Sequence, residues 1–141
     1  MKTVLPSTAK AKLDFRLVPD QDPDDIAEKV RKHLAAEGFD DVEVTLAEGE
    51  FPARSDANHP FVELVQRTAR EVYGQEPVVY PNMAGTQPLF PMMQLLGVPM
   101  ASAGIGYPDA RAHAPDENIR LSDFILGTKH VAAIIEGLGE G

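Results

Sequence analysis

The chain has 141 residues, and its 22 acidic and 13 basic side chains give a formal net charge of −9. A nucleic-acid-binding domain normally carries a basic face, so this balance argues against nucleic acid as a partner. There is no cysteine, which excludes disulfides and thiolate ligands and leaves His, Asp and Glu to hold any metal. The apolar stretches are too short for a membrane helix, and the first residues lack a signal-peptide core. We therefore expect a cytoplasmic protein with no membrane partner.

The first fifty residues show two strand patterns around one helix pattern. Residues 9–17 alternate strictly between apolar and charged side chains, which predicts a strand with one face in solvent. A helix is expected next, with Asp22 as its N-terminal cap and Gly38 at its end. Residues 42–46 alternate again and predict a second strand. Two strands and one helix bury too little apolar surface to stand alone, so this unit is expected to be half of a split-βαβ arrangement.

The rest of the chain predicts helices that alternate with short apolar strands. This alternation favours a mixed α/β (α+β) fold with a mainly buried sheet. The pattern breaks near residue 50, so we expect one domain over residues 1–50 and a second over residues 51–141. In the second domain, helices are expected at 59–74, 85–97 and 122–138, the last capped by Ser122, and strands at 78–80 and 99–103.

A long loop over residues 104–118 gathers His, Asp, Glu and Arg directly after a predicted strand. Its His113 is a candidate metal ligand, because a neutral imidazole binds metal ions and a nearby carboxylate can orient the ring. One histidine is only part of a ligand set, so an ordinary loop histidine is the alternative. The other three histidines, His33, His59 and His130, are expected at the surface or at the boundary of the core.

The second candidate site is the turn Gly85-Thr86-Gln87-Pro88. A glycine and a hydroxyl residue at a helix start present backbone N–H groups and the positive end of the helix dipole. Gly85 and Thr86 are therefore candidates to bind a substrate carboxylate or the oxyanion that forms during amide hydrolysis. The alternative is plain helix capping by Thr86.

These motifs together resemble the dinuclear-zinc peptidase and deacylase family. Its members include acetylornithine deacetylase, succinyl-diaminopimelate desuccinylase, carboxypeptidase G, aminoacylase and the carnosinase-like dipeptidases. The resemblance covers nearly the whole chain and looks like the C-terminal part of the family. It is carried by residues 5–11, residues 13–19, the turn at 85–88, the segment Ala112-His113-Ala114-Pro115-Asp116-Glu117-Asn118, and residues 124–129.

The resemblance implies a division of labour within the chain. Residues 1–50 would be the second half of the family's lid domain, and residues 51–141 the closing part of its catalytic domain. His113 would be the family's last metal ligand, and Gly85 and Thr86 would contact the carboxylate end of the substrate. Two departures stand out: Asp116 occupies a position where the family usually has asparagine, and residues 80–83 lack the arginine of the dipeptidase branch.

The family's other ligands and its glutamate general base belong to segments upstream of the part represented here, so no catalytic residue is expected in this chain. The resemblance thus implies a fragment of a homodimeric, two-zinc hydrolase that cleaves amide bonds of dipeptides or N-acyl amino acids. Alone it is expected to be inactive and to hold no zinc tightly. The alternative is a non-catalytic α/β module that dimerises through the edge of the strand at residues 9–17.

Overall fold

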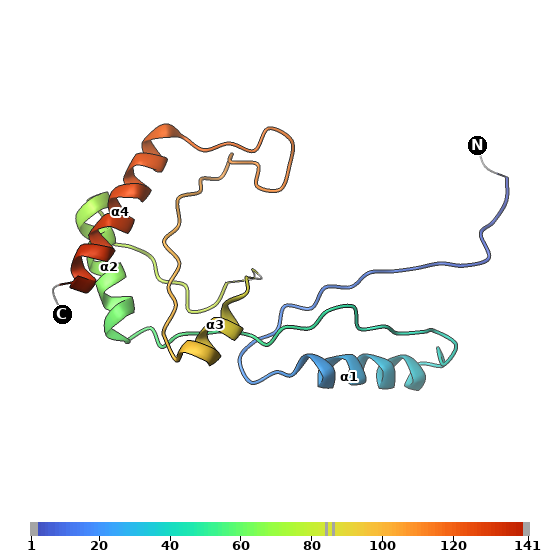
Figure 1. The fold of residues 1–141 in the computed structure, drawn as a ribbon. Helices are drawn as coiled ribbons and strands as arrows, with labels where there is room; N and C mark the ends of the chain where they lie inside the picture. The colour runs from blue at the N-terminus through green and yellow to red at the C-terminus, as the bar shows by residue number, and fades with distance from the viewer. Residues whose placement is uncertain (1–2, 84, 86, 140–141) are drawn as a thin grey trace.

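The computed structural model describes residues 3–83, 85 and 87–139, and its regular elements there are α-helices (Figure 1). No β-strand occurs within these described ranges, so the expected α/β (α+β) fold is wrong for this structure. The helices are α1 (Pro23–Ala36), α2 (Pro60–Tyr73), α3 (Leu89–Leu96) and α4 (Leu121–Gly139).

The segment at residues 9–17 shows why the strand predictions fail. Figure 1 draws it as a long segment without regular structure, and it forms no ladder with any described part of the chain. The side chain of Leu13 is 71% exposed and that of Phe15 is 53% exposed. An alternating pattern favours an extended backbone, but a strand also needs a neighbour about 4.8 Å away to pair its N–H and C=O groups. No described segment supplies that neighbour.

The strands expected in the second half are absent for the same reason. Val78 and Tyr80, which were expected in a buried strand, are 76% and 78% exposed. Residues 99–103 also form no strand, and neither do residues 42–46 of the first half. A short apolar run predicts burial, but here no described sheet exists to bury it.

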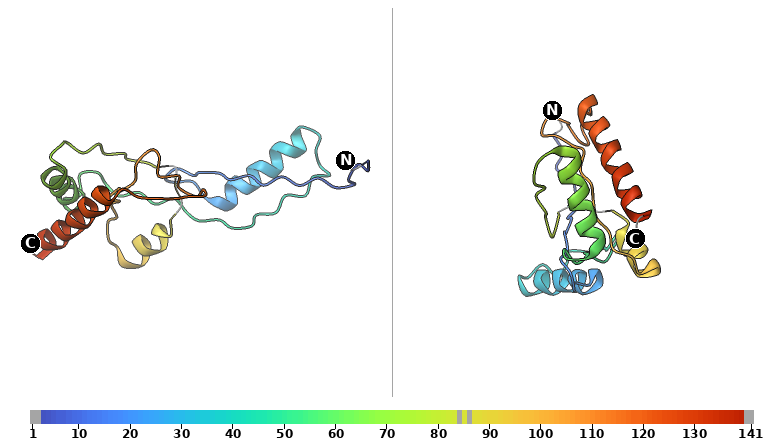
Figure 2. Two further views of the ribbon diagram at one scale, coloured as in Figure 1. Left: turned by 90° about the horizontal axis from the view of Figure 1, so that it is seen from above. Right: turned by 90° about the vertical axis from the view of Figure 1, so that its left-hand side faces the viewer.

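Helix α1 begins as its sequence predicts. The side chain of Asp22 accepts hydrogen bonds from the backbone N–H groups of Asp24 (2.8 Å) and Asp25 (3.4 Å), and Pro23 occupies the first turn. Its apolar side faces Leu13 and Phe15 across an open groove of about 450 Å³. The left-hand view of Figure 2 shows α1 standing apart from α2 and α4.

The core of the molecule lies between α2 and α4, which pack side by side (Figures 1 and 2). The buried residues of α2 are Val62, Val65, Thr68 and Ala69. Those of α4 are Gly127, which lies against Ile105, and His130, which faces α2.

The sequence predicts the C-terminal ends of α2 and α3 correctly, because a glycine marks each of them. Gly74 and Gly97 follow α2 and α3 with φ values of 66° and 64°, in the left-handed region that glycine adopts freely. The predicted starts of α1 and α2 are right, but those of α3 and α4 are wrong. Helix α3 begins at Leu89 rather than at Gly85, and α4 begins at Leu121, so Ser122 is inside the helix rather than its cap. None of the helices in the described part is both long and apolar enough to cross a membrane.

Candidate functional site

The loop between residues 104 and 120 is closed at its base by Asn118. The backbone N–H of Asn118 donates to the carbonyl oxygen of Ala110 (3.0 Å), and its side-chain amide donates to the carbonyl oxygens of Asp116 (2.9 Å) and Asp109 (3.4 Å). Its side-chain oxygen accepts a hydrogen bond from the hydroxyl of Tyr107. Asn118 therefore ties the outgoing arm of the loop to the returning arm.

The tip of the loop consists of tight turns. The N–H of Ala114 donates to the carbonyl oxygen of Arg111 at 2.9 Å. Arg111, His113 and Asp116 have φ values of 53°, 62° and 62°, although none is glycine. Left-handed backbone is unfavourable for residues with a side chain, and it persists only where the surroundings impose it. The cross-loop bonds of Asn118 and the ion pair between Arg111 and Asp116 are the described interactions that span this turn.

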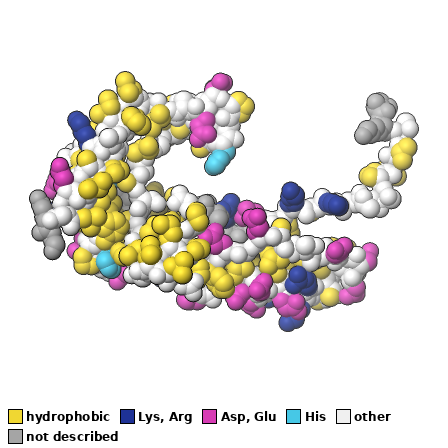
Figure 3. Space-filling model, in the orientation of Figure 1, with side chains coloured by type: hydrophobic (Ala, Val, Ile, Leu, Met, Phe, Trp, Pro, Cys, Tyr) yellow, Lys and Arg dark blue, Asp and Glu magenta, His cyan; other side chains and the backbone are white. Residues whose placement is uncertain are grey.

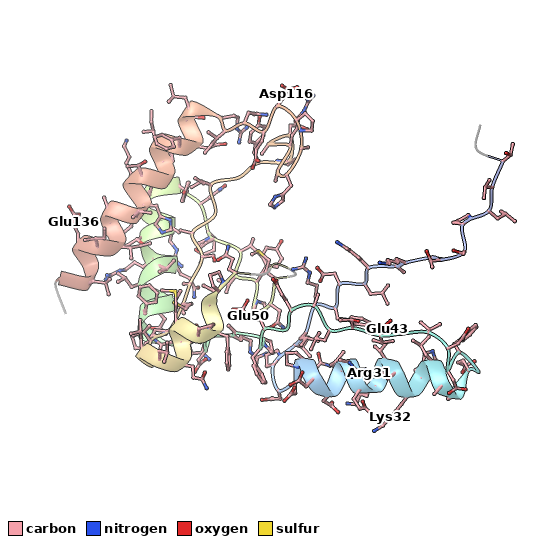
Figure 4. The ribbon with its side chains drawn as sticks, turned by 45° about the vertical axis from the view of Figure 1, so that its right-hand side comes forward. Arg31, Lys32, Glu43, Glu50, Asp116 and Glu136 are labelled. Atoms are coloured by element: carbon pink, nitrogen blue, oxygen red, sulfur yellow. The ribbon has the colours of Figure 1, made fainter. Side chains whose placement is uncertain are left out.

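His113 lies at this tip with its side chain exposed. Within the described residues its imidazole makes no hydrogen bond and no ion pair. Figure 3 shows the loop as an arm that stands across an open hollow from the rest of the molecule. Figure 4 places Asp116 on this loop, and its carboxylate pairs with Arg111 at 3.3 Å.

The described residues do not form a metal site by themselves. They contain no group of three His, Asp or Glu side chains placed to hold a metal ion. The loop offers one free imidazole, while the carboxylate of Asp116 is engaged by Arg111. A protein zinc site uses at least three protein ligands, so this donor set is incomplete.

The second predicted site lies partly outside the described residues. Thr86 belongs to that undescribed part, so neither its proposed carboxylate contact nor its capping role is tested. Gly85 is exposed, and a Cβ built on it would lie 3.3 Å from the Cε of Met83. No hydrogen bond or ion pair among the described residues joins Gly85 to the loop of His113.

His130 is a residue whose role the sequence did not reveal. It was expected on the polar side of its helix, but it is only 2% exposed between α2 and α4. Its Nε2 lies 3.1 Å from both the carbonyl oxygen of Val65 and the hydroxyl of Thr68, and its ring meets Tyr73 edge-on at 5.5 Å. The sequence around it contains apolar residues such as Val131 and Ile134, and nothing in this pattern indicated that His130 would be buried instead.

A bidentate ion pair lies away from the loop. Arg70, near the end of α2, holds both carboxylate oxygens of Glu76 at 2.5 Å. The hydrogen bonds from Arg70 lower the pKa of Glu76 below its ordinary value, and the same pair raises the pKa of Arg70. This pair fastens the turn after α2 and takes no part in the candidate site.

The comparison with known families decides the identity. Residues 3–137 match Peptidase family M20/M25/M40. The chain belongs to the M20 peptidase family. Among solved structures, this M20 chain is similar to one described as an M20 family metallo-carboxypeptidase, Sso-CP2 from Sulfolobus solfataricus, with 35% identity and a TM-score of 0.75. The match covers 92% of this chain and 32% of that one, so the M20 chain spans about a third of the relative's length.

Proposed function

We propose that this M20 chain is the part of a zinc-dependent hydrolase that contributes His113 as one metal ligand. The observation that carries the proposal is the position of His113, exposed at the tip of a closed loop, with an imidazole that has no partner in the described residues of an M20 chain. The family implies a metal, and zinc suits an imidazole ligand. The remaining ligands and the general base would come from the two thirds of the family's length that this chain does not span.

The proposed substrates are dipeptides or N-acyl amino acids, whose amide bond the complete enzyme would hydrolyse. The turn at Gly85 and Thr86 would contact the substrate's carboxylate. The similar Sulfolobus protein is described as a carboxypeptidase, which supports a substrate with a free C-terminal carboxylate. We assign residues 1–50 to a lid domain and residues 51–141 to the catalytic domain.

The proposal is tested with a chimera. The segment of the Sulfolobus enzyme that matches this chain is replaced by this chain, and bound zinc is measured together with hydrolysis of a dipeptide and of an N-acetyl amino acid. We expect the chimera to bind zinc and His113→Ala to weaken that binding at least tenfold, because one ligand is lost. Substitution of the exposed His33 by Ala is the matched control. Equal zinc affinity in the chimera and in its His113→Ala variant would refute the assignment.

A second function is favoured by one observation. Residues 9–17 form no strand ladder with any described segment, and Leu13 and Phe15 border an apolar groove along α1. A segment with strand alternation but no ladder favours association with another strand, so a homodimer formed through this segment is the second candidate. Sedimentation of the chain at tens of micromolar tests it, because a purely monomeric chain would contradict association at that concentration.

A further inference from the structure

We infer that Asn118 is a positioning residue that sets the backbone conformation of His113 by clamping the two arms of its loop. The inference deepens the proposed function, and the importance of His113 rests on that function. The geometry on which the clamp rests belongs to this chain alone. It can therefore be tested whether or not the chain contributes to a metal site.

Four hydrogen bonds join Asn118 to the rest of the loop. On the outgoing arm, its backbone N–H donates to Ala110 and its side-chain amide donates to Asp109, while the hydroxyl of Tyr107 donates to its side-chain oxygen. On the returning arm, its side-chain amide also donates to the carbonyl oxygen of Asp116 at 2.9 Å. His113 lies between the two arms, so both ends of its turn are held by one side chain.

The site requires an amide rather than a carboxylate. The two carbonyl oxygens of Asp109 and Asp116 only accept hydrogen bonds, so the atom facing them must be an N–H donor. The Tyr107 hydroxyl is the one partner that can donate, so it faces the side-chain oxygen. An aspartate at position 118 has the same shape, but it would place a charged oxygen against two carbonyl oxygens and lose both donated bonds.

The base of the loop is also fixed on its outer side. The guanidinium of Arg120 lies 4.5 Å above the ring of Tyr107, and its Nε donates to Asp123 in the first turn of α4 at 2.6 Å. Tyr107 is thus held against the start of α4 while its hydroxyl holds Asn118. The chain of contacts connects a rigid helix to the turn that carries His113.

The test compares three variants of the full 141-residue chain by amide hydrogen exchange and NMR. Asn118→Asp removes the donors without changing the shape, and Tyr107→Phe removes the hydroxyl alone. Asn58→Asp is the matched control, because Asn58 is exposed and the same change adds the same charge away from the loop. The three-bond coupling of the His113 amide reports its φ angle, and the amide of Ala114 reports the turn itself.

We expect Asn118→Asp to speed exchange at Ala114 at least about tenfold, since several hydrogen bonds are lost together. The His113 coupling should move to the averaged value of an unstructured chain. Tyr107→Phe should give a smaller change in the same direction. Amides in the centre of α2 and α4 should keep their protection in all variants, which separates a loosened loop from an unfolded protein.

Two results would overturn the inference. One is an unchanged coupling at His113 in the Asn118→Asp variant. The other is an equal change in the Asn58→Asp control. This experiment does not measure zinc. The clamp can therefore fail while the zinc assignment holds, and the zinc assignment can fail while the clamp holds.

Discussion

The contact between α2 and α4 should depend on the hydrogen bond made by His130. The carbonyl oxygen of Val65 can only accept, so the Nε2 of His130, 3.1 Å away, must carry the proton. The other ring nitrogen, Nδ1, is buried and has no partner among the described residues. His130 therefore makes one favourable interhelical interaction while leaving one ring nitrogen unsatisfied.

The magnitude for His130→Ala follows from this balance. Emptying a buried site of a large side chain costs about 2 kcal/mol or more. Loss of the interhelical hydrogen bond adds about 1 kcal/mol. Removal of the unsatisfied Nδ1 and the better helix propensity of alanine return roughly 1 kcal/mol. No partner is left unpaired, because the hydroxyl of Thr68 keeps its bond to the carbonyl oxygen of Leu64 at 2.9 Å. The net loss is about 2 kcal/mol.

Hydrogen exchange of amides in the middle of α2 and α4 measures this loss. A loss of about 2 kcal/mol corresponds to roughly thirtyfold faster exchange through opening of the helix pair. His130→Gln is the matched control, because its amide nitrogen reaches the position of Nε2 and keeps the bond to Val65. We expect it to cost less than about 1 kcal/mol. If alanine and glutamine were equally destabilising, the hydrogen bond would not be the source of the stability.

Two further predictions concern α4 and the end of α2. Gly127→Ala should destabilise the chain, because a Cβ there would overlap the stiff side chain of Ile105. Gly139→Ala is the control, because its Cβ meets nothing within 4 Å and the change should be neutral or slightly stabilising. Urea unfolding followed by circular dichroism compares the two variants, and equal unfolding midpoints would contradict the reasoning. The lowered pKa of Glu76 means that its pairing with Arg70 stabilises the fold above the ordinary value of 4.5 and is lost as the pH falls through the lower folded value. NMR titration of the Glu76 carboxyl should therefore show a midpoint below 4.5 that rises in Arg70→Gln; no rise would mean that Arg70 is not the cause.

The local features of the fold were predictable because they depend on neighbouring residues. Asp22 caps α1, and Gly74 ends α2 in a left-handed conformation, as the sequence indicates. Such signals act within one turn of a helix. The period-two pattern at residues 9–17 was equally clear, but a strand depends on a partner that no local pattern specifies.

The candidate site was predictable only in part. The sequence singled out His113, and its place at an exposed loop tip agrees with a ligand role without testing it. The cross-loop bonds of Asn118 were not foreseen, because they join residues up to eleven positions apart through a fold-specific turn. The burial of His130 depends on contact with α2, where its partner Thr68 lies 62 residues earlier in the chain. Helical spacing alone does not say which face a distant helix will cover.

Zinc affinity of the chimera with the Sulfolobus enzyme, measured with and without His113, tests the central claim most directly. We expect zinc to bind to the chimera and His113→Ala to weaken this binding at least tenfold, while the same substitution at His33 leaves it unchanged. A chimera that folds but binds zinc equally well without the His113 imidazole would show that His113 is not a metal ligand.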